Sequence, residues 1–138
     1  MTTFFVHGNP KAQPRARATI RGNKPGVYDP GTSDGWKMMV AIAARETKQR
    51  FDGPVVVDLE FVFERPKRHW GVKGLLPGAP SYHTAKPDLD NLAKSTLDSM
   101  VSCGFLADDR IVVKLTLAKR WGVMDGCHVA VDHVDSAS

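Results

Sequence analysis

Paired carboxylates are the residues of this sequence best suited to chemistry. Asp88 and Asp90 stand two positions apart, and a second pair, Asp108 and Asp109, follows after a gap of helical length. Lys94 comes one helical turn after Asp90. Carboxylate oxygens favour a hard cation such as Mg2+, which keeps several waters and takes further ligands from substrate phosphate. The spacing therefore indicates a cation site that serves phosphate chemistry.

Phosphodiester hydrolysis needs an activated water, a polarised phosphorus and a stabilised leaving oxygen, and carboxylates, Mg2+ and a lysine supply all three. We expect Asp88, Asp90 and Asp109 to converge on one point, because a strand that starts after Asp109 returns beside the helix that starts near Asp88. Lys94 would face the phosphate, and Asp98 would support the site, as would Asp108. Zinc fits poorly, since no His or Cys lies at ligand spacing beside these residues.

Ordinary structural roles exist for each of these residues. Asp88 suits the N-cap of the helix that begins beside it. Asp90, Lys94 and Asp98 have the i, i+4, i+8 spacing of ion pairs on an exposed helix face. The later Asp-Asp pair suits a turn before a strand. A helix start needs only one capping carboxylate, however, so the second one is left without an ordinary explanation.

The overall charge favours a polyanionic partner. The 138 residues carry a formal net charge of +4 and a pI of about 9.2, and the basic residues gather in two Gly- and Pro-rich stretches near residues 11–24 and 65–73. No apolar run is long enough to span a bilayer, and the first residues lack the pattern of a secretory signal. Cys103 and Cys127 match neither a metal spacing nor a disulfide framework, so we expect a cytoplasmic protein without a membrane partner.

The elements that must position these residues follow from periodicity. We expect one α+β domain over residues 1–138, with a frayed tail at 135–138. A mixed sheet with helices packed on it should follow the order β-α-β-α-β-β, and the last two strands should form an antiparallel hairpin. The expected elements are a strand at 2–7, a helix at 33–51, a strand at 55–64, a helix at 88–102, and strands at 111–119 and 127–134.

The segment 65–87 holds four prolines and three glycines, which exclude regular structure over most of it. A long loop in a compact domain is usually functional or disordered, and the basic and aromatic content of this one suits nucleic acid. Trp70 suits either base stacking or covering the sheet edge. The predicted DNA contacts are Lys11, Arg15, Arg17, Arg68, Trp70, Lys73 and Lys86.

The acidic region also resembles a known family. The resemblance is to the RusA-type Holliday-junction resolvases, and it is strongest over residues 83–113. A weaker likeness near the start rests on Gly8-x-Pro10 and Arg15-x-Arg17. The motifs that carry it are Lys86-Pro-Asp-Leu-Asp-Asn-Leu-Ala-Lys94, Leu97-Asp98, Gly104-Phe105 and Asp108-Asp109.

This resemblance implies a homodimer that cuts paired strands across a four-way DNA junction. It implies that Asp88, Asp90 and Asp109 bind catalytic Mg2+ and that Lys94 is essential. Arg110 departs from the smaller residue common in the family, which leaves the preferred substrate open. Two alternatives remain: a nuclease for other branched or single-stranded DNA, and a DNA-binding protein without hydrolytic activity.

Overall fold

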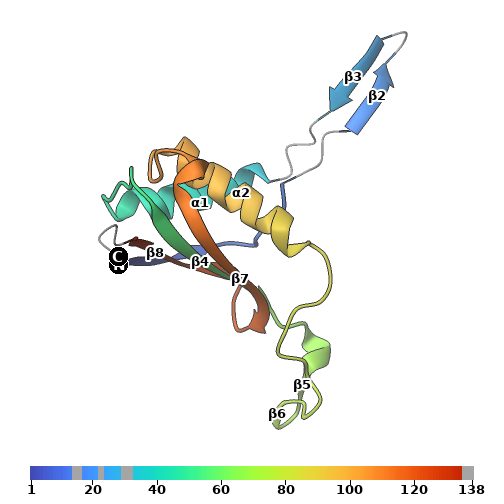
Figure 1. Cartoon of the computed structure of the whole chain (residues 1–138). Coiled ribbons are helices and arrows are strands. Elements are labelled where there is room, and N and C mark those ends of the chain that lie inside the picture. The colour runs from blue at the N-terminus through green and yellow to red at the C-terminus, as the bar shows by residue number, and fades with distance from the viewer. Residues whose placement is uncertain (14–16, 22–23, 29–32, 135–138) are drawn as a thin grey trace.

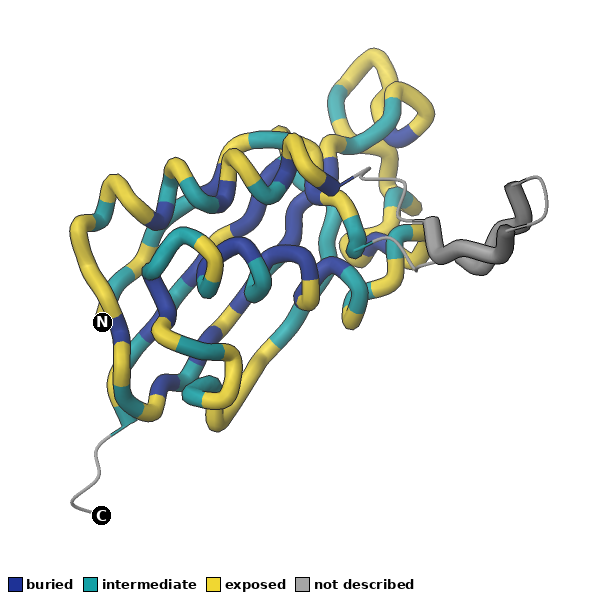
Figure 2. The backbone as a smooth tube through the Cα atoms, turned by 90° about the horizontal axis from the view of Figure 1, so that it is seen from above, coloured by how far each residue is buried: buried dark blue, intermediate teal, exposed yellow. Residues whose placement is uncertain are grey.

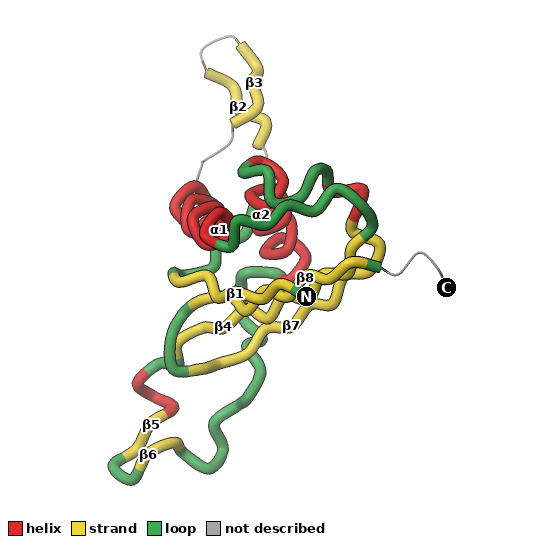
Figure 3. Tube along the Cα trace, turned by 90° about the vertical axis from the view of Figure 1, so that its left-hand side faces the viewer, coloured by secondary structure: helices red, strands yellow, loops and turns green. Residues whose placement is uncertain are grey.

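A mixed four-stranded sheet carries two helices on one face (Figures 1 and 3). The computed structural model describes residues 1–13, 17–21, 24–28 and 33–134. The strand order is β1-β8-β4-β7, so β1 and β7 are the edges. The six elements are β1 (Thr2–His7), α1 (Asp34–Glu46), β4 (Val55–Glu64), α2 (Leu89–Ser102), β7 (Val112–Gly122) and β8 (Gly126–His133).

These six elements confirm the predicted α+β class, although further short strands interrupt the predicted order along the chain. Strand β4 forms because apolar and polar residues alternate, and it buries Val55, Val57, Leu59 and Phe61 toward the helices. Each such side chain contributes roughly 1.5–3 kcal/mol on burial. The buried residues lie along the sheet and the inner faces of the helices (Figure 2).

The predicted antiparallel hairpin of the last two strands is wrong. Strand β4 lies between them, parallel to β7 and antiparallel to β8. The segment 123–125 instead crosses the end of β4, where Asp125 Oδ1 accepts a 2.7 Å hydrogen bond from the backbone amide of Glu64. Helix α2 makes the crossover between the parallel strands β4 and β7. The helix therefore starts near the end of β7 and finishes near the start of β7.

Helix α2 packs on α1 through small polar side chains. The Trp36 indole Nε1 donates to Thr96 Oγ1 at 3.0 Å, and Ser99 Oγ donates to a backbone carbonyl of α1. By helical periodicity alone Ser95 would lie on the polar face of α2, but it is fully buried and donates to the carbonyl of Lys11 at 2.6 Å. Short side chains let the helices approach closely, and their hydroxyls are satisfied by main-chain oxygens.

Sequence patterns missed several short elements. The predicted basic loop contains the antiparallel pair β2 (Arg17–Arg21) and β3 (Lys24–Tyr28), and α1 ends at Glu46 rather than near Phe51. The segment 65–87 contains the 3-10 helix η1 (Lys67–His69) and the short pair β5 (Trp70–Gly71) and β6 (Gly74–Leu75). A second 3-10 helix, η2 (Asp109–Ile111), precedes β7. No helix in the described part of the chain has the length and apolar character needed to cross a membrane.

Candidate active site

The start of helix α2 presents two exposed carboxylates. Asp88 occupies the N-cap position with an extended backbone (φ −70°, ψ 142°), but its side chain makes no capping hydrogen bond. The capping explanation therefore fails for this carboxylate. Asp90 lies in the first turn and is also exposed. Both carboxylates are therefore open to solvent at the start of α2, where the positive end of the helix dipole favours a negatively charged group.

Lys94 lies one turn along the same helix and is exposed. It makes no ion pair with Asp90 or Asp98, so the described residues do not contain the alternative i, i+4 pairs. The N-terminal segment runs beside this part of α2, where the amide of Gln13 donates to the carbonyl of Asn91 at 3.0 Å. A lysine ammonium is thus available beside the acidic pair.

The second acidic pair lies beyond the other end of α2. Asp108 Oδ1 accepts a 2.9 Å hydrogen bond from the backbone amide of Arg110 and lies 3.3 Å from its Nε. That backbone hydrogen bond is the main reason the pKa of Asp108 is lowered. The pKa of Asp109 is raised, chiefly by its hydrogen bond with Asp108 and the neighbouring charge, and further by Asp98. Arg110 thus engages Asp108, while Asp109 makes no ion pair within the described residues.

The expected convergence of three carboxylates does not occur within one chain. Helix α2, with 14 residues at about 1.5 Å per residue, separates its two ends by roughly 21 Å. Strand β7 gives a second measure of the distance between the acidic pairs, because Lys119 Nζ donates to the carbonyl of Pro87, the residue before Asp88, at 2.8 Å. The seven steps from Val112 to Lys119, at about 3.3 Å each, span roughly 23 Å. Asp88 and Asp109 therefore lie at opposite ends of β7. The described residues contain no group of three His, Cys, Asp or Glu that could hold a metal ion.

The segment 65–87 is held against the end of the sheet. His83 is buried between Phe63 and Trp121, with ring centroids at 4.2 and 4.5 Å. Burial, and then the charge of Lys119, lower the pKa of His83. Arg65 Nη1 also donates to the carbonyl of Pro80 at 2.8 Å. These contacts place the segment where it leads directly into the Asp88 end of α2.

The predicted DNA contacts divide into two groups. Lys86 is exposed just before Asp88, and Lys11 is exposed on the N-terminal segment that contacts α2. The second group lies on η1, β5 and the turn that follows, which extend past the end of the sheet in Figure 1, and consists of Arg68, Trp70 and Lys73. All three are exposed, and Trp70 is 45% exposed. Arg15 lies outside the described residues, as does the side chain of Arg17.

Lys119 is a positioning residue that sequence patterns missed. Its ammonium donates to the carbonyls of Ala85 and Pro87, both at 2.8 Å, and so fixes the main chain that enters Asp88. No local signal marks it, because its partners are more than thirty positions away and are main-chain atoms. Arg120, the next residue of β7, donates from its Nε to Glu60 Oε1 on β4 at 2.9 Å.

An α+β domain with open carboxylates and lysines at a helix start suits an enzyme that cleaves DNA, and comparison with known families agrees. Residues 7–132 match the family described as Endodeoxyribonuclease RusA. The chain belongs to the RusA endodeoxyribonuclease family, which confirms the resemblance seen in the sequence. The chain is also 33% identical over 126 residues to an uncharacterized protein, YqaN of Bacillus subtilis (strain 168), and the match covers 84% of each chain.

Proposed function

We propose that this protein is a magnesium-dependent endonuclease that resolves four-way DNA junctions as a homodimer. The observation that carries the proposal is the pair Asp88 and Asp90 at the start of α2, in a chain of this family. Asp88 makes no capping hydrogen bond, both carboxylates are open to solvent, and Lys94 lies one turn away. Neither carboxylate has an ion-pair partner among the described residues. These carboxylates are therefore available to a charged ligand at a helix start.

The donor set suits magnesium in kind, because all its members are carboxylate oxygens. A bound Mg2+ would supply an activated water and polarise the scissile phosphate. Asp88 and Asp90 would hold the ion from one helix start, and among the described residues of one chain no third carboxylate joins them. Lys94 would contribute positive charge toward a phosphate oxygen, which carries more charge in the transition state than in the ground state.

Basic side chains around the helix start suit a DNA backbone. Lys11 and Lys86 extend the positive charge from Lys94 along the surface, where each would pair with a phosphate. Trp70, on the segment that extends past the sheet, is available to stack on an exposed base. A four-way junction offers both features, since its arms present backbone and its centre presents less constrained bases.

Cleavage of a synthetic four-way junction tests the proposal, alongside duplex, flap and single-stranded DNA of matched sequence. We expect paired nicks on the junction with Mg2+ and none with a chelator. Asp90→Asn should reduce cleavage at least about a hundredfold, because Asp90 would hold the Mg2+ that stabilises charge on the phosphate in the transition state. Asp58→Asn is the matched control, because it removes the same charge from the sheet face opposite the helices.

Each other outcome of this assay would support a different function or a different site. Salt-dependent binding of DNA without any cleavage would identify a DNA-binding protein instead. Equal or faster cleavage of flaps or single strands would keep the chemistry and change the substrate. Unchanged cleavage by Asp90→Asn would remove the helix start from the active site.

A further inference from the structure

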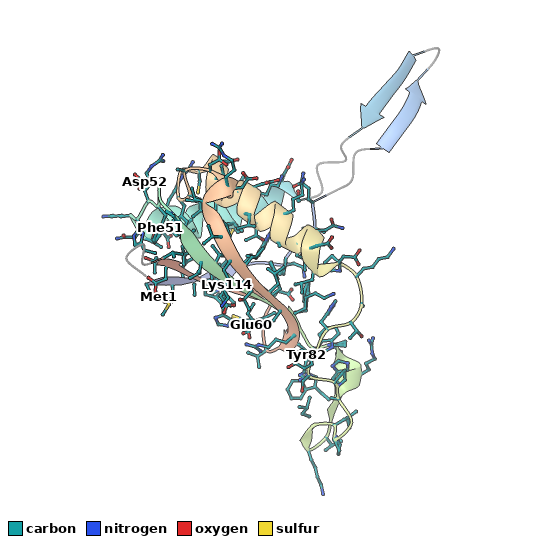
Figure 4. The ribbon with its side chains drawn as sticks, in the orientation of Figure 1. Met1, Phe51, Asp52, Glu60, Tyr82 and Lys114 are labelled. Carbon is teal, nitrogen blue, oxygen red and sulfur yellow. The ribbon has the colours of Figure 1, made fainter. Side chains whose placement is uncertain are left out.

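Residues 66–80, called the projecting hairpin below, contain η1, β5 and β6 and extend beyond the end of the sheet (Figures 1 and 4). We propose that the projecting hairpin is an apolar wedge that separates base pairs beside the branch point of the junction. Trp70 and Leu75 would be the side chains that insert between bases. The inference deepens the proposed function and rests on it, because it states how the protein recognises a branched substrate.

Apolar side chains gather on the outer surface of the projecting hairpin. Trp70 is 45% exposed, Leu75 is 47% exposed, and Val72 in the turn is fully exposed. Trp70 pairs directly with Leu75 across β5 and β6, so both side chains leave the same face of the hairpin. Their Cβ atoms are then about 4.5–5.5 Å apart. The pair therefore forms one continuous apolar surface that faces solvent.

The other face of the hairpin supports this surface. A Cβ atom on Gly71 would lie 2.9 Å from Leu76 Cδ2, so Leu76 packs over the backbone of β5 on the face opposite Trp70. The amide of Leu76 also donates to the carbonyl of His69 at 2.9 Å. Gly74 closes the turn with a φ of +112°, a conformation that favours glycine. Leu76 thus holds the hairpin together and leaves the Trp70–Leu75 surface uncovered.

The root of the projecting hairpin is fixed to the end of β7. His69 is buried, and its ring meets the ring of Trp121 edge-on with the centroids at 5.0 Å. Arg65, which precedes the hairpin, donates from Nη1 to the carbonyl of Pro80 at the hairpin's far end. Tyr82, labelled in Figure 4, lies where the chain returns to β7. A wedge must resist being pushed back when it enters stacked bases, and these contacts provide that resistance.

The charge of the projecting hairpin favours DNA as the occupant of its apolar surface. Lys67, Arg68 and Lys73 are exposed, and no acidic residue occurs between Glu64 and Asp88. Basic groups pair with phosphates, while apolar side chains that enter between base steps partially unstack them. A protein that covered this surface would have to be both acidic and apolar, whereas DNA offers phosphates and base faces together.

The projecting hairpin begins a short distance from the candidate active site. Lys119 Nζ donates to the carbonyl of Pro87, and Asp88 comes next in the chain. Trp121, which contacts the root of the hairpin, lies two residues farther along β7, or about 7 Å. This distance equals about two nucleotides of one strand at about 3.4 Å each. An inserted Trp70 would therefore unstack bases about two positions from a phosphate held near Asp88.

Chemical probing tests the wedge without reference to cleavage. Permanganate oxidises unstacked thymines, so thymines are placed at the paired positions nearest the branch point of a synthetic junction, and a chelator prevents cleavage. Saturating wild-type protein should raise their reactivity above that of the free junction, and the double variant Trp70→Ala, Leu75→Ser should lose this rise. Met38→Ser, which changes a 63% exposed apolar residue on α1, is the matched control and should keep it. Equal reactivity with the wild type and the double variant would overturn the wedge.

A pre-opened substrate tests whether this separation of bases matters for cleavage. On a fully paired junction with Mg2+, the double variant should nick at least about tenfold more slowly than the wild type, which is within the cost of losing one stacked base. On a junction with mismatched pairs beside the branch point, it should nick nearly as fast as the wild type, because the substrate supplies the opening. Equal loss on both junctions would overturn the wedge, since the side chains would then be ordinary contacts.

The remaining outcomes separate the wedge from the proposed function. If the double variant had a smaller oligomeric state in gel filtration, the apolar surface would be a protein contact and the wedge would be overturned. A wild-type protein that binds the junction but cuts neither form would contradict the proposed function, while the permanganate pattern would still decide the role of the hairpin. A wild type and a double variant that cut both forms equally well would overturn the wedge and leave the function intact.

Discussion

Replacing Lys119 by methionine should loosen the main chain that delivers Asp88 to the active site. The lysine ammonium donates to the carbonyls of Ala85 and Pro87, both at 2.8 Å. Methionine keeps a long unbranched side chain and part of its packing, but it donates no hydrogen bond. The two carbonyls would then be left to water, and the segment before α2 would lose its link to β7.

The size of the effect follows from these two bonds. A hydrogen bond to a charged group contributes about 1.5–3 kcal/mol when it is protected from water. Lys119 is half-buried, so we take the lower end of that range and expect a total of about 2–3 kcal/mol. This corresponds to a rise of roughly 30- to 150-fold in the equilibrium constant for local opening, since 1.36 kcal/mol is tenfold.

Amide hydrogen exchange of residues 81–88, read by mass spectrometry, measures that opening. We expect exchange of this segment to accelerate by the factor above while exchange in β4 stays unchanged, and we expect junction cleavage to fall with little loss of DNA binding. Lys48→Met is the control, because Lys48 is exposed beyond α1 and its ammonium has no partner in the described chain. Unchanged exchange in residues 81–88 would refute the positioning role of Lys119.

Two further predictions concern stability. Thr96→Val should lower the free energy of unfolding by about 1–3 kcal/mol in urea titrations, because the buried indole N–H of Trp36 loses its acceptor; Thr96→Ser keeps the hydroxyl and should cost only about 0.8 kcal/mol for the lost methyl. His83 has a pKa below its ordinary value of 6.5 because of burial and the nearby Lys119. Below pH 6.5 the unfolded chain binds more protons at this residue than the folded chain, so the contribution of His83 to stability is complete above that pH and is lost as the pH falls toward the folded pKa. The melting temperature should therefore drop more between pH 7.5 and 5.5 in the wild type than in His83→Gln.

Specific results would contradict these two predictions. Equal destabilisation by Thr96→Val and Thr96→Ser would show that the hydroxyl contributes nothing to the contact between the helices. A His83→Gln protein whose melting temperature changes with pH as steeply as that of the wild type would show that other groups carry the acid sensitivity.

Local patterns predicted the elements well where the chain itself imposes them. The alternation in β4 matched its observed bounds, residues 55–64, and the apolar stripe of α2 matched its helix to within one residue. Pairing between strands was harder to predict. The last two strands are joined by a short segment that suits a hairpin, but β4 lies between them. The central place of β4, with a neighbouring strand on each edge, decides this order, and no local signal marks it.

The candidate site shows the same division. The residue types and the motif gave Asp88, Asp90, Lys94 and Asp109 as the residues to examine, and their roles remain predictions. The expected convergence failed because the full length of α2 separates the two acidic pairs and β7 returns alongside the helix, so residues 21 positions apart in sequence lie at opposite ends of these elements. Ser95 looks polar in a periodicity plot, but it is fully buried because the N-terminal segment covers it and the carbonyl of Lys11 accepts its hydroxyl hydrogen bond.

The strands at the two ends of the chain lie side by side, with Thr2 level with Val131 and the amino group of Met1 3.5 Å from the Asp132 carboxylate. Strands β1 and β8 lie close enough for a linker to join them in a circular permutation. A permuted chain that is joined there and opened near Gly78 would begin with α2 and β7 and finish with α1 and β4. The parallel β4–β7 pair would then unite the two halves of the new chain without a covalent crossover. Folding of that chain would show that packing alone is sufficient to specify the strand order.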